Sequence, residues 1–166
     1  ICLIERFEGD KKRYYGFIST GNFNESTAKI YSDFTLFTSN QKILREVHKV
    51  FSFLKANYKI YDYKHLIVSP HQTSKKLFKL IDNEISNVKN GLKGNIILKL
   101  NSFTSYKFVD KLYEASRSGV KITLLVRGIC CLVPNKIGFS DNIVVKSVID
   151  KYLEHSRVYV FENGGD

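Results

Sequence analysis

The sequence has no Met or Trp, only 3 Cys and 2 Pro, and no long uninterrupted apolar run. Each apolar stretch falls far short of the roughly 20 residues that a bilayer requires, so no transmembrane segment is expected. Cys130 and Cys131 are adjacent and Cys2 stands alone, which argues against a disulfide framework and a metal-type cysteine spacing. Cysteines used in this way favour a reducing compartment, and the predicted location is the cytoplasm.

The ends of the sequence are unusual. It begins without Met inside the apolar run 1–4, with no basic segment or cleavage site ahead of it. It closes on residues 163–166, a turn that normally leads into further structure. Both features predict an internal fragment of a longer protein.

The composition is that of a folded protein. Of the 166 residues, 43% are hydrophobic and 13% aromatic, and their spread over the whole length excludes a disordered chain. The length suits one ordinary domain or two small half-domains. Lys and Arg number 26 against 16 Asp and Glu, and the net charge of +10 favours a polyanionic or phosphorylated partner. Scattered basic residues on a solvated surface account for part of that charge.

Strand-like and helical apolar patterns follow one another in the first part of the chain, separated by turn residues. The predicted elements are a hairpin from strands 1–7 and 14–18, a polar loop 20–27, a strand 28–38 and a helix 40–54. Segment 56–64 is rich in Tyr and Lys and loses this spacing. We therefore expect a connection there, with a boundary near Tyr63.

Strands and helices alternate in the second part of the chain. The predicted elements are a strand 65–69 stopped by Pro70, a helix capped by Thr73 or Ser74 and ended by Gly91, a strand 95–100, a helix 104–118 and strands 120–126 and 158–161. This order implies crossover connections, and therefore an α/β unit with a mostly parallel sheet and helices on its faces. Ligands of such units gather at the carboxyl ends of the strands.

Small polar residues around one glycine form the first candidate site, at 19–27, and Tyr31 follows it. Hydroxyl, amide and backbone donors can surround an anion there, and Tyr31 offers a flat face for stacking. The alternative is a polar turn followed by an ordinary strand tyrosine.

Arg127, directly after the buried strand 120–126, is the second candidate. Its guanidinium suits two-pronged recognition of phosphate oxygens, and Gly128 lets a ligand approach the backbone. The alternative is an arginine that closes the strand with a surface carboxylate. Cys130 and Cys131 are expected to be small buried apolar residues rather than nucleophiles.

His155 is the third candidate, between Glu154 and Arg157 at a predicted helix-to-strand junction. An imidazole flanked by a carboxylate and a guanidinium can transfer protons, bind phosphate or become phosphorylated. An ordinary surface histidine is the alternative. The sequence assigns no chemistry to the other three histidines, at positions 48, 65 and 71.

Taken together, these segments resemble one enzyme family far more specifically than any of them does separately. The matching segments are 19–24 (STGNFN), 27–33 (TAKIYSD), 112–116 (LYEAS), 125–132 (LVRGICCL) and 152–157 (YLEHSR). In this order they are similar to polyphosphate kinase of the long-chain, phosphohistidine type, over nearly the whole chain. The resemblance implies reversible transfer of the terminal phosphate of ATP to inorganic polyphosphate, with magnesium.

The resemblance also implies an architecture and roles for single residues. It implies α/β parts of two phospholipase-D-like domains with mixed, mostly parallel sheets and flanking helices, the first domain ending in 1–63 and the second beginning in 64–166. Tyr31 would stack near the nucleotide base, Arg127 would hold the nucleotide phosphates, and His155 would contact the nucleotide and act as a general acid or base. The phosphorylated histidine and the magnesium-binding residues would precede this chain, so no metal ligand is named in it.

The same resemblance implies ATP, ADP and polyphosphate as partners, no nucleic acid, and a homo-oligomer, with peripheral membrane association left open. Ser19 stands where many relatives have glycine, which weakens the expectation of a close backbone approach in that loop. Two alternatives remain at this point. One is a phospholipase-D-type phosphodiesterase or nuclease, and the other is a basic polyanion-binding module without enzymatic activity.

Overall fold

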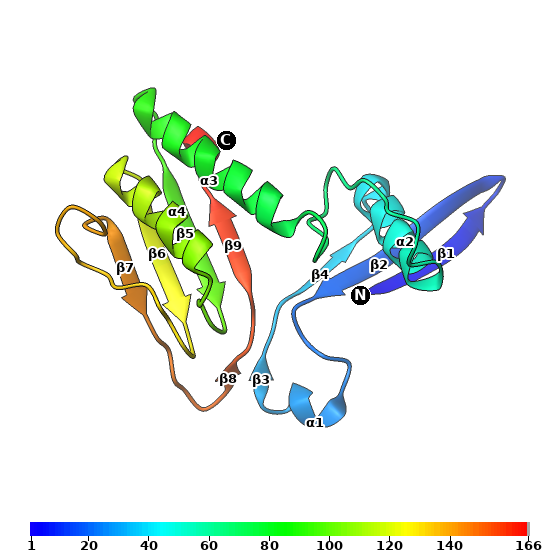
Figure 1. The fold of residues 1–166 in the computed structure, drawn as a ribbon. Helices are drawn as coiled ribbons and strands as arrows, with labels where there is room; N and C mark the ends of the chain where they lie inside the picture. Colours follow the sequence, from blue (N-terminus) through cyan, green and yellow to red (C-terminus); the bar gives the residue numbers. More distant parts are fainter. Residues whose placement is uncertain (166) are drawn as a thin grey trace.

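Two α/β lobes joined by an irregular segment make up residues 1–165, the part of the chain that this computed structural model describes (Figure 1). The helices are α1 (Glu25–Ala28), α2 (Gln41–Lys55), α3 (Thr73–Lys89) and α4 (Tyr106–Arg117), followed by the 3-10 turn η1 (Asn163–Gly165). The strands are β1 (Cys2–Glu8), β2 (Lys11–Ser19), β3 (Tyr31–Ser32), β4 (Thr35–Thr38), β5 (Asn95–Leu100), β6 (Lys121–Val126), β7 (Ile143–Lys146), β8 (Leu153–Glu154) and β9 (Val158–Phe161). The mixed α/β fold predicted from the sequence is confirmed.

The first lobe is an antiparallel sheet in the order β1-β2-β4, with α2 packed against it. Gly9 takes a φ of 59° in the β1–β2 turn, a conformation that glycine adopts without strain. The Asn40 side chain caps α2 by accepting hydrogen bonds from two backbone N–H groups of the first turn. Leu44 and Val47 of α2 are buried. The predicted hairpin and helix are therefore confirmed.

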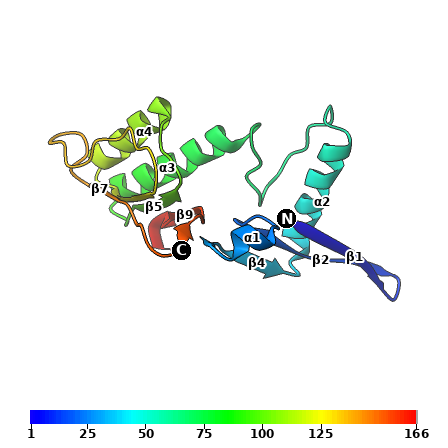
Figure 2. The ribbon, with the colours of Figure 1, turned by 90° about the horizontal axis from the view of Figure 1, so that it is seen from below.

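The second lobe contains the larger core. Its sheet has the order β7-β6-β5-β9, parallel from β7 to β5 and antiparallel between β5 and β9. Figures 1 and 2 show α3 and α4 on one face of this sheet. Apolar side chains of both helices and of the central strands meet there and are almost fully buried, among them Ile81, Ile85, Leu112, Ile96, Leu98, Ile122 and Leu124. Burial of one such side chain contributes about 1.5–3 kcal/mol, so this layer is the main source of the lobe's stability.

A short parallel pair of strands, β3 and β8, joins the two lobes (Figure 1). Tyr31 pairs with Leu153, and Ser32 pairs with Glu154. The N–H of Leu153 donates to the carbonyl oxygen of Ile30 at 2.8 Å. This pairing brings the residues that follow β3 next to the residues that follow β8, although they are far apart in the sequence.

The strand predicted at 65–69 is wrong, because the backbone there is bonded to side chains instead of to a sheet. The N–H groups of residues 64–66 donate to the buried carboxylate of Glu46 at 2.8–2.9 Å. Nζ of Lys76 donates to the carbonyl oxygen of Leu66 in this segment and to that of Tyr63 just before it. The edge of β5 is paired instead with β9, from the far end of the chain.

Several other element boundaries differ from the prediction. Segment 28–38 is not one strand, since α1 ends in it and β3 and β4 are separated by a break at Asp33. The α3 helix begins after Gln72, and no side chain caps it. Strand β7 was not predicted.

The helix-to-strand junction predicted at His155 is wrong as well. His155 lies between two strands, β8 and β9. The residues of β8 pair with β3 of the other lobe, a contact that the local pattern of the sequence does not contain.

Candidate functional site between the lobes

Asp33 lies between β3 and β4 and is held by the loop that precedes α1. Oγ1 of Thr20 donates to Oδ1 of Asp33 at 2.7 Å. The backbone N–H of Thr20 donates to the carbonyl oxygen of Phe34 at 3.0 Å. A Cβ atom at Gly21 would lie 2.7 Å from Oδ2 of Asp33, so a glycine is required for the loop to close on the carboxylate. The polar loop predicted to surround an anion thus directs its Thr20 hydroxyl to a carboxylate of the chain itself.

His155 comes from the second lobe, and its imidazole meets Asp33. Nδ1 of His155 lies 3.0 Å from Oδ1 of Asp33, and the two side chains are 14% and 20% exposed. An ionised carboxylate only accepts hydrogen bonds, so this contact assigns the proton of the neutral ring to Nδ1 and leaves a lone pair on Nε2. Nη1 of Arg157 donates to the carbonyl oxygen of His155 at 3.0 Å and lies 3.5 Å from Nε2.

The pKa of Asp33 lies below its ordinary value. Burial by itself raises this pKa, but hydrogen bonds from Thr20 and His155 and the positive charges of His155 and Arg157 outweigh burial. The carboxylate therefore stays ionised at neutral pH. An ionised Asp33 accepts a hydrogen bond from Nδ1–H and so fixes the orientation of the imidazole.

The ring of Tyr31 packs on the same imidazole. The centroids of the Tyr31 and His155 rings are 4.8 Å apart, and the ring planes are inclined by 36°. Two candidate residues that the sequence placed in different segments therefore lie in direct contact. They come from opposite lobes, so the site exists only while the lobes are paired.

Arg127 follows β6, and its guanidinium is held by Asn101, which follows β5. Nε of Arg127 donates to Oδ1 of Asn101 at 3.0 Å, and Nη2 donates to the same oxygen. Nη1 of Arg127 is buried and has no hydrogen-bond partner among the described residues. Buried donors normally have partners, so Nη1 is the atom at which this guanidinium can take up an acceptor oxygen. The partner is an amide oxygen and not the surface carboxylate of the alternative interpretation.

Arg127 lies apart from the Tyr31–His155 pair. It lines one small cavity together with Lys99 and with Glu154, the residue before His155. Of the three candidates from the sequence, Tyr31 and His155 are thus in contact, and Arg127 lies beside the segment that carries His155.

Two features next to Arg127 follow from the fold. A Cβ atom at Gly128 would lie 3.0 Å from the carbonyl oxygen of Asn101. The group that approaches the backbone of Gly128 is therefore the chain's own carbonyl, whereas the sequence predicted a ligand. The expectation that both cysteines are buried is wrong, because Cys131 is exposed and Cys130 is half-buried.

Sequence reasoning missed Asp33 and Asn101 as partners of the candidate residues. Asp33 and His155 are separated by 122 positions, so no local spacing links them. The available signal was a carboxylate two residues after Tyr31, at the end of a short polar segment.

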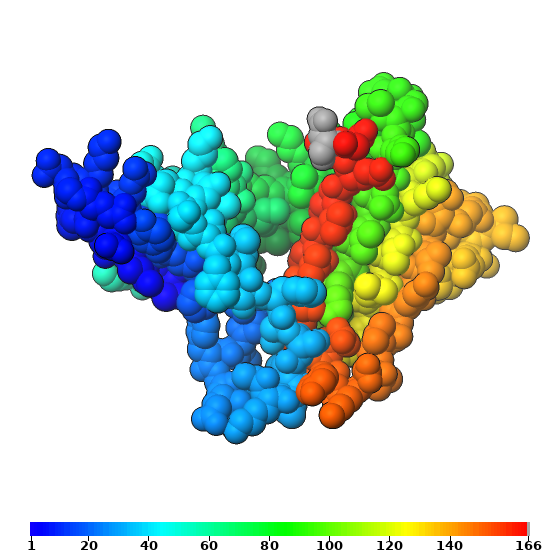
Figure 3. Space-filling model, turned by 180° about the vertical axis from the view of Figure 1, so that it is seen from behind, coloured from blue at the N-terminus to red at the C-terminus, as the bar shows by residue number. Residues whose placement is uncertain are grey.

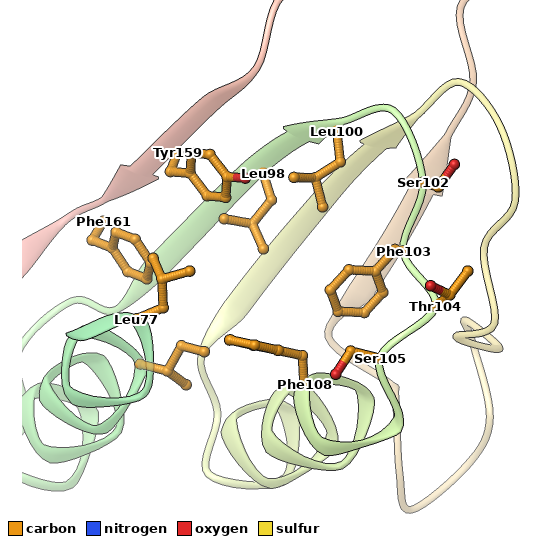
Figure 4. A pocket seen from close by; sticks show the side chains of 11 residues that line it. Leu77, Leu98, Leu100, Ser102, Phe103, Thr104, Ser105, Phe108, Tyr159 and Phe161 are labelled. Carbon is orange, nitrogen blue, oxygen red and sulfur yellow. The ribbon is translucent and has the colours of Figure 1, made fainter. Parts of the chain in front are cut away.

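An apolar cavity of about 220 Å³ lies elsewhere in the second lobe, between α3, α4 and the sheet (Figure 4). Leu77, Phe108 and Phe161 are among the side chains that line it, with the hydroxyl groups of Ser102 and Thr104 at one end. It is not lined by Tyr31, Arg127 or His155.

Metal-binding clusters and membrane-spanning helices are missing from the described part of the chain. Within residues 1–165, no three His, Cys, Asp or Glu side chains gather closely enough to hold a metal ion. The same described residues include no helix with both the length and the apolar character needed to cross a bilayer.

The fold and the site define a two-lobed α/β protein in which a carboxylate from one lobe holds a histidine from the other. Family models match both lobes: polyphosphate kinase C-terminal domain 1 matches residues 1–60, and polyphosphate kinase C-terminal domain 2 matches residues 66–166. The chain belongs to the polyphosphate kinase family. The resemblance seen in the sequence motifs is confirmed.

Individual relatives agree with this assignment. The chain is 49% identical to the polyphosphate kinase of Salmonella typhimurium and 48% identical to that of Escherichia coli K12, in each case over all 166 residues. Its fold is similar to that of the crystal structure of polyphosphate kinase from Porphyromonas gingivalis, with a TM-score of 0.87, 42% sequence identity and coverage of 98% of this chain and 27% of that one. The chain spans 24% of the length of the two curated relatives.

Proposed function

We propose that this chain contributes nucleotide-binding and proton-transfer residues to an ATP:polyphosphate phosphotransferase. In the proposed reaction, the bond between the terminal phosphorus of ATP and its bridging oxygen breaks, which releases ADP. The phosphorus forms a new bond to a nitrogen of the histidine expected upstream of this chain, not to His155. The phosphoryl group then moves from that nitrogen to the terminal oxygen of inorganic polyphosphate, and both steps are reversible. The observation that carries the proposal is the contact between Asp33 and His155, made across the two lobes.

His155 is the proposed general acid or base. With Nδ1–H donating to the ionised Asp33, the lone pair on Nε2 can accept a proton from the substrate and return it. Asp33 supports both states, because it orients the neutral ring and stabilises the charged one.

Tyr31 and Arg127 are the proposed nucleotide-binding residues. The Tyr31 ring already packs on one aromatic ring, that of His155, and its size suits stacking with a base. The unpaired Nη1 of Arg127 can donate to a phosphate oxygen while Asn101 keeps the guanidinium in place. Phosphoryl transfer depends chiefly on such positioning and charge neutralisation, and the net charge of +10 favours a polyanionic substrate.

The remaining features of the proposal concern the surroundings of the reaction. We propose that magnesium accompanies ATP, with no ligand assigned to it among residues 1–165. We also propose that residues 1–63 belong to one phospholipase-D-like domain and 64–166 to a second, in a cytoplasmic homo-oligomer. The two lobes, the two family models and the scarcity of cysteine support this part of the proposal.

The test is ATP-dependent polymer synthesis by the full-length protein and its His155→Ala variant. A positioned proton-transfer group is worth about 10²–10⁴-fold, so we expect the kcat of the variant to fall at least about 100-fold with unchanged circular dichroism. His65→Ala, at an exposed histidine of the connecting segment, is the matched control and should retain activity. Unchanged synthesis in His155→Ala would refute the role of His155. Phosphodiester hydrolysis by the wild type, lost in this variant, would favour the phosphodiesterase alternative.

A further inference from the structure

Lys99 is a charged residue of β5, an inner strand of the second lobe's sheet, and its side chain leaves the sheet on the face opposite α3 and α4. Its neighbours in β5, Leu98 and Leu100, line the apolar cavity beneath those helices (Figure 4). Successive side chains of a strand point to opposite faces, so Lys99 points to the other one. Figure 3 shows that face from behind, where β5, β6, β7 and β9 lie at the surface with no described helix over them.

The ammonium group of Lys99 contacts both residues that flank His155. Nζ of Lys99 lies 2.7 Å from Oε2 of Glu154, and it also donates to Oγ of Ser156. Ser156 is only 3% exposed, and the Lys99 side chain is 17% exposed. One cation thus fixes the chain immediately before and immediately after the candidate histidine.

The first lobe holds the same segment by its backbone. The N–H of Ser156 donates to the carbonyl oxygen of Ser32 at 3.1 Å, and Oγ of Ser32 donates to the carbonyl oxygen of Leu153 at 3.3 Å. These bonds belong to the β3–β8 contact. Lys99 adds a tie to the sheet of the second lobe, so the segment around His155 is anchored on both sides.

We propose that Lys99 is a positioning residue for His155, which it holds against Asp33 by binding Glu154 and Ser156 together. The inference rests on the proposed function of His155. Two rival roles for Lys99 fit these contacts less well. A partly exposed ion pair that only stabilises the fold would contribute little, typically about 0–1 kcal/mol. A direct contact between Lys99 and a substrate phosphate would require the ammonium to leave partners that already occupy it.

The experiment measures kcat and the KM for ATP in polymer synthesis by the full-length protein and its Lys99→Met and Lys99→Arg variants. Met keeps the apolar stem and removes the charge and the donors. A displacement of about 1 Å in a reacting group can lower the rate about 100-fold, so we expect kcat of Lys99→Met to fall by about 10- to 100-fold while the KM for ATP changes less than about twofold. Lys99→Arg should recover most of the loss, because a guanidinium can reach both acceptors.

Lys111→Met is the matched control. Lys111 on α4 is 19% exposed and also contacts two acceptors, Asp82 and Glu114, but it lies outside the candidate site. It therefore undergoes the same chemical change and a comparable loss of stability, and its kcat should stay unchanged. An equal loss of kcat in the Lys99 and Lys111 variants would show that Lys99 acts only through stability, and a raised KM with unchanged kcat would show direct substrate binding. Either result overturns the proposal.

A second comparison separates this inference from the proposed function. In a His155→Ala background, Lys99→Met should lower the residual activity by less than about twofold, since a residue that acts through His155 has nothing left to position. If Lys99→Met lowers kcat in the His155→Ala background by the same factor as in the wild type, the inference is overturned while the role of His155 stays intact. Full activity of His155→Ala would overturn the proposed function itself. If Lys99→Met does not fold, Glu154→Gln provides the readout. It keeps the shape and removes the charge that Lys99 binds, and it should lower kcat several-fold without a change in KM.

Discussion

Asp33 and His155 stand 122 positions apart in the chain and meet at 3.0 Å between Oδ1 and Nδ1. The pairing of β3 with β8 places the two residues just beyond the ends of neighbouring strands. Neither lobe contains both groups. The acid–base chemistry proposed for the protein therefore depends on the contact between the lobes.

Asp33→Asn should lower the kcat of polymer synthesis by about tenfold or more, with little change in the KM for ATP. The amide cannot stabilise a protonated imidazole, and it can hold the ring in the wrong tautomer. The measurement is the pH dependence of kcat. Because the pKa of Asp33 is lowered, the wild type keeps its carboxylate charged into mildly acid solution and loses this contribution only as the pH falls through the lowered pKa. A variant with the wild-type kcat at every pH would contradict the pairing.

Tyr31→Ala should raise the KM for ATP about two- to tenfold, whereas Tyr31→Phe should be tolerated. Stacking needs the ring and is worth about 0.5–1.5 kcal/mol, and the hydroxyl contributes little to it. The Ala variant should also lose kcat, because the ring packs against His155 at a centroid distance of 4.8 Å. Tyr58→Ala, in the exposed connecting segment, is the control. Phe as damaging as Ala would indicate a hydroxyl hydrogen bond instead.

Arg127→Lys should weaken nucleotide binding nearly as much as Arg127→Ala. Lysine supplies charge, but it cannot bind Asn101 with two nitrogens and still present a third to a phosphate. Asn101→Leu should lower the affinity for the nucleotide less than either Arg127 variant, since the guanidinium remains but is no longer held by Asn101. Calorimetric titration with a non-hydrolysable ATP analogue measures all three. Full affinity in Arg127→Lys would mean that only the charge matters.

Glu46→Gln should loosen the segment between the lobes. Burial raises the pKa of Glu46, but hydrogen bonds from the backbone of residues 64, 66 and 65 outweigh burial and lower it. An amide offers one acceptor oxygen in place of two, so at least one of these partly buried N–H groups loses its partner, at a cost of about 1 kcal/mol. The backbone amides of 64–66 should exchange their hydrogens faster in the variant than in the wild type. At neutral pH the variant should also unfold at a lower temperature.

The acid dependence of the same variant gives a check on the cause. A carboxyl group with a lowered folded pKa stabilises the protein above its unfolded pKa and loses that contribution as the pH falls through the folded value. The difference between wild type and Glu46→Gln should therefore shrink in acid. Glu25→Gln, at an exposed residue of α1, should change neither exchange nor stability. A difference that does not depend on pH would point to packing rather than charge.

Local patterns of the sequence were sufficient for much of the fold. The β1–β2 hairpin, α2 and the buried strands β5 and β6 follow from apolar spacing and turn residues, which act within a few positions. Tyr31, Arg127 and His155 were found as candidates from residue type and motif. Their assigned roles remain proposals for the experiments above.

Tertiary structure decided the rest. Segment 65–69 has the composition of a strand, yet the carboxylate of Glu46 and the ammonium of Lys76 occupy its backbone groups, and β9 takes the place beside β5. Strand β8 exists because it pairs with β3, and the same pairing joins His155 to Asp33. Such contacts depend on which distant segments become neighbours when the core of each lobe is buried. Residue types alone determine the groups available for chemistry, but only the folded chain determines which of them meet.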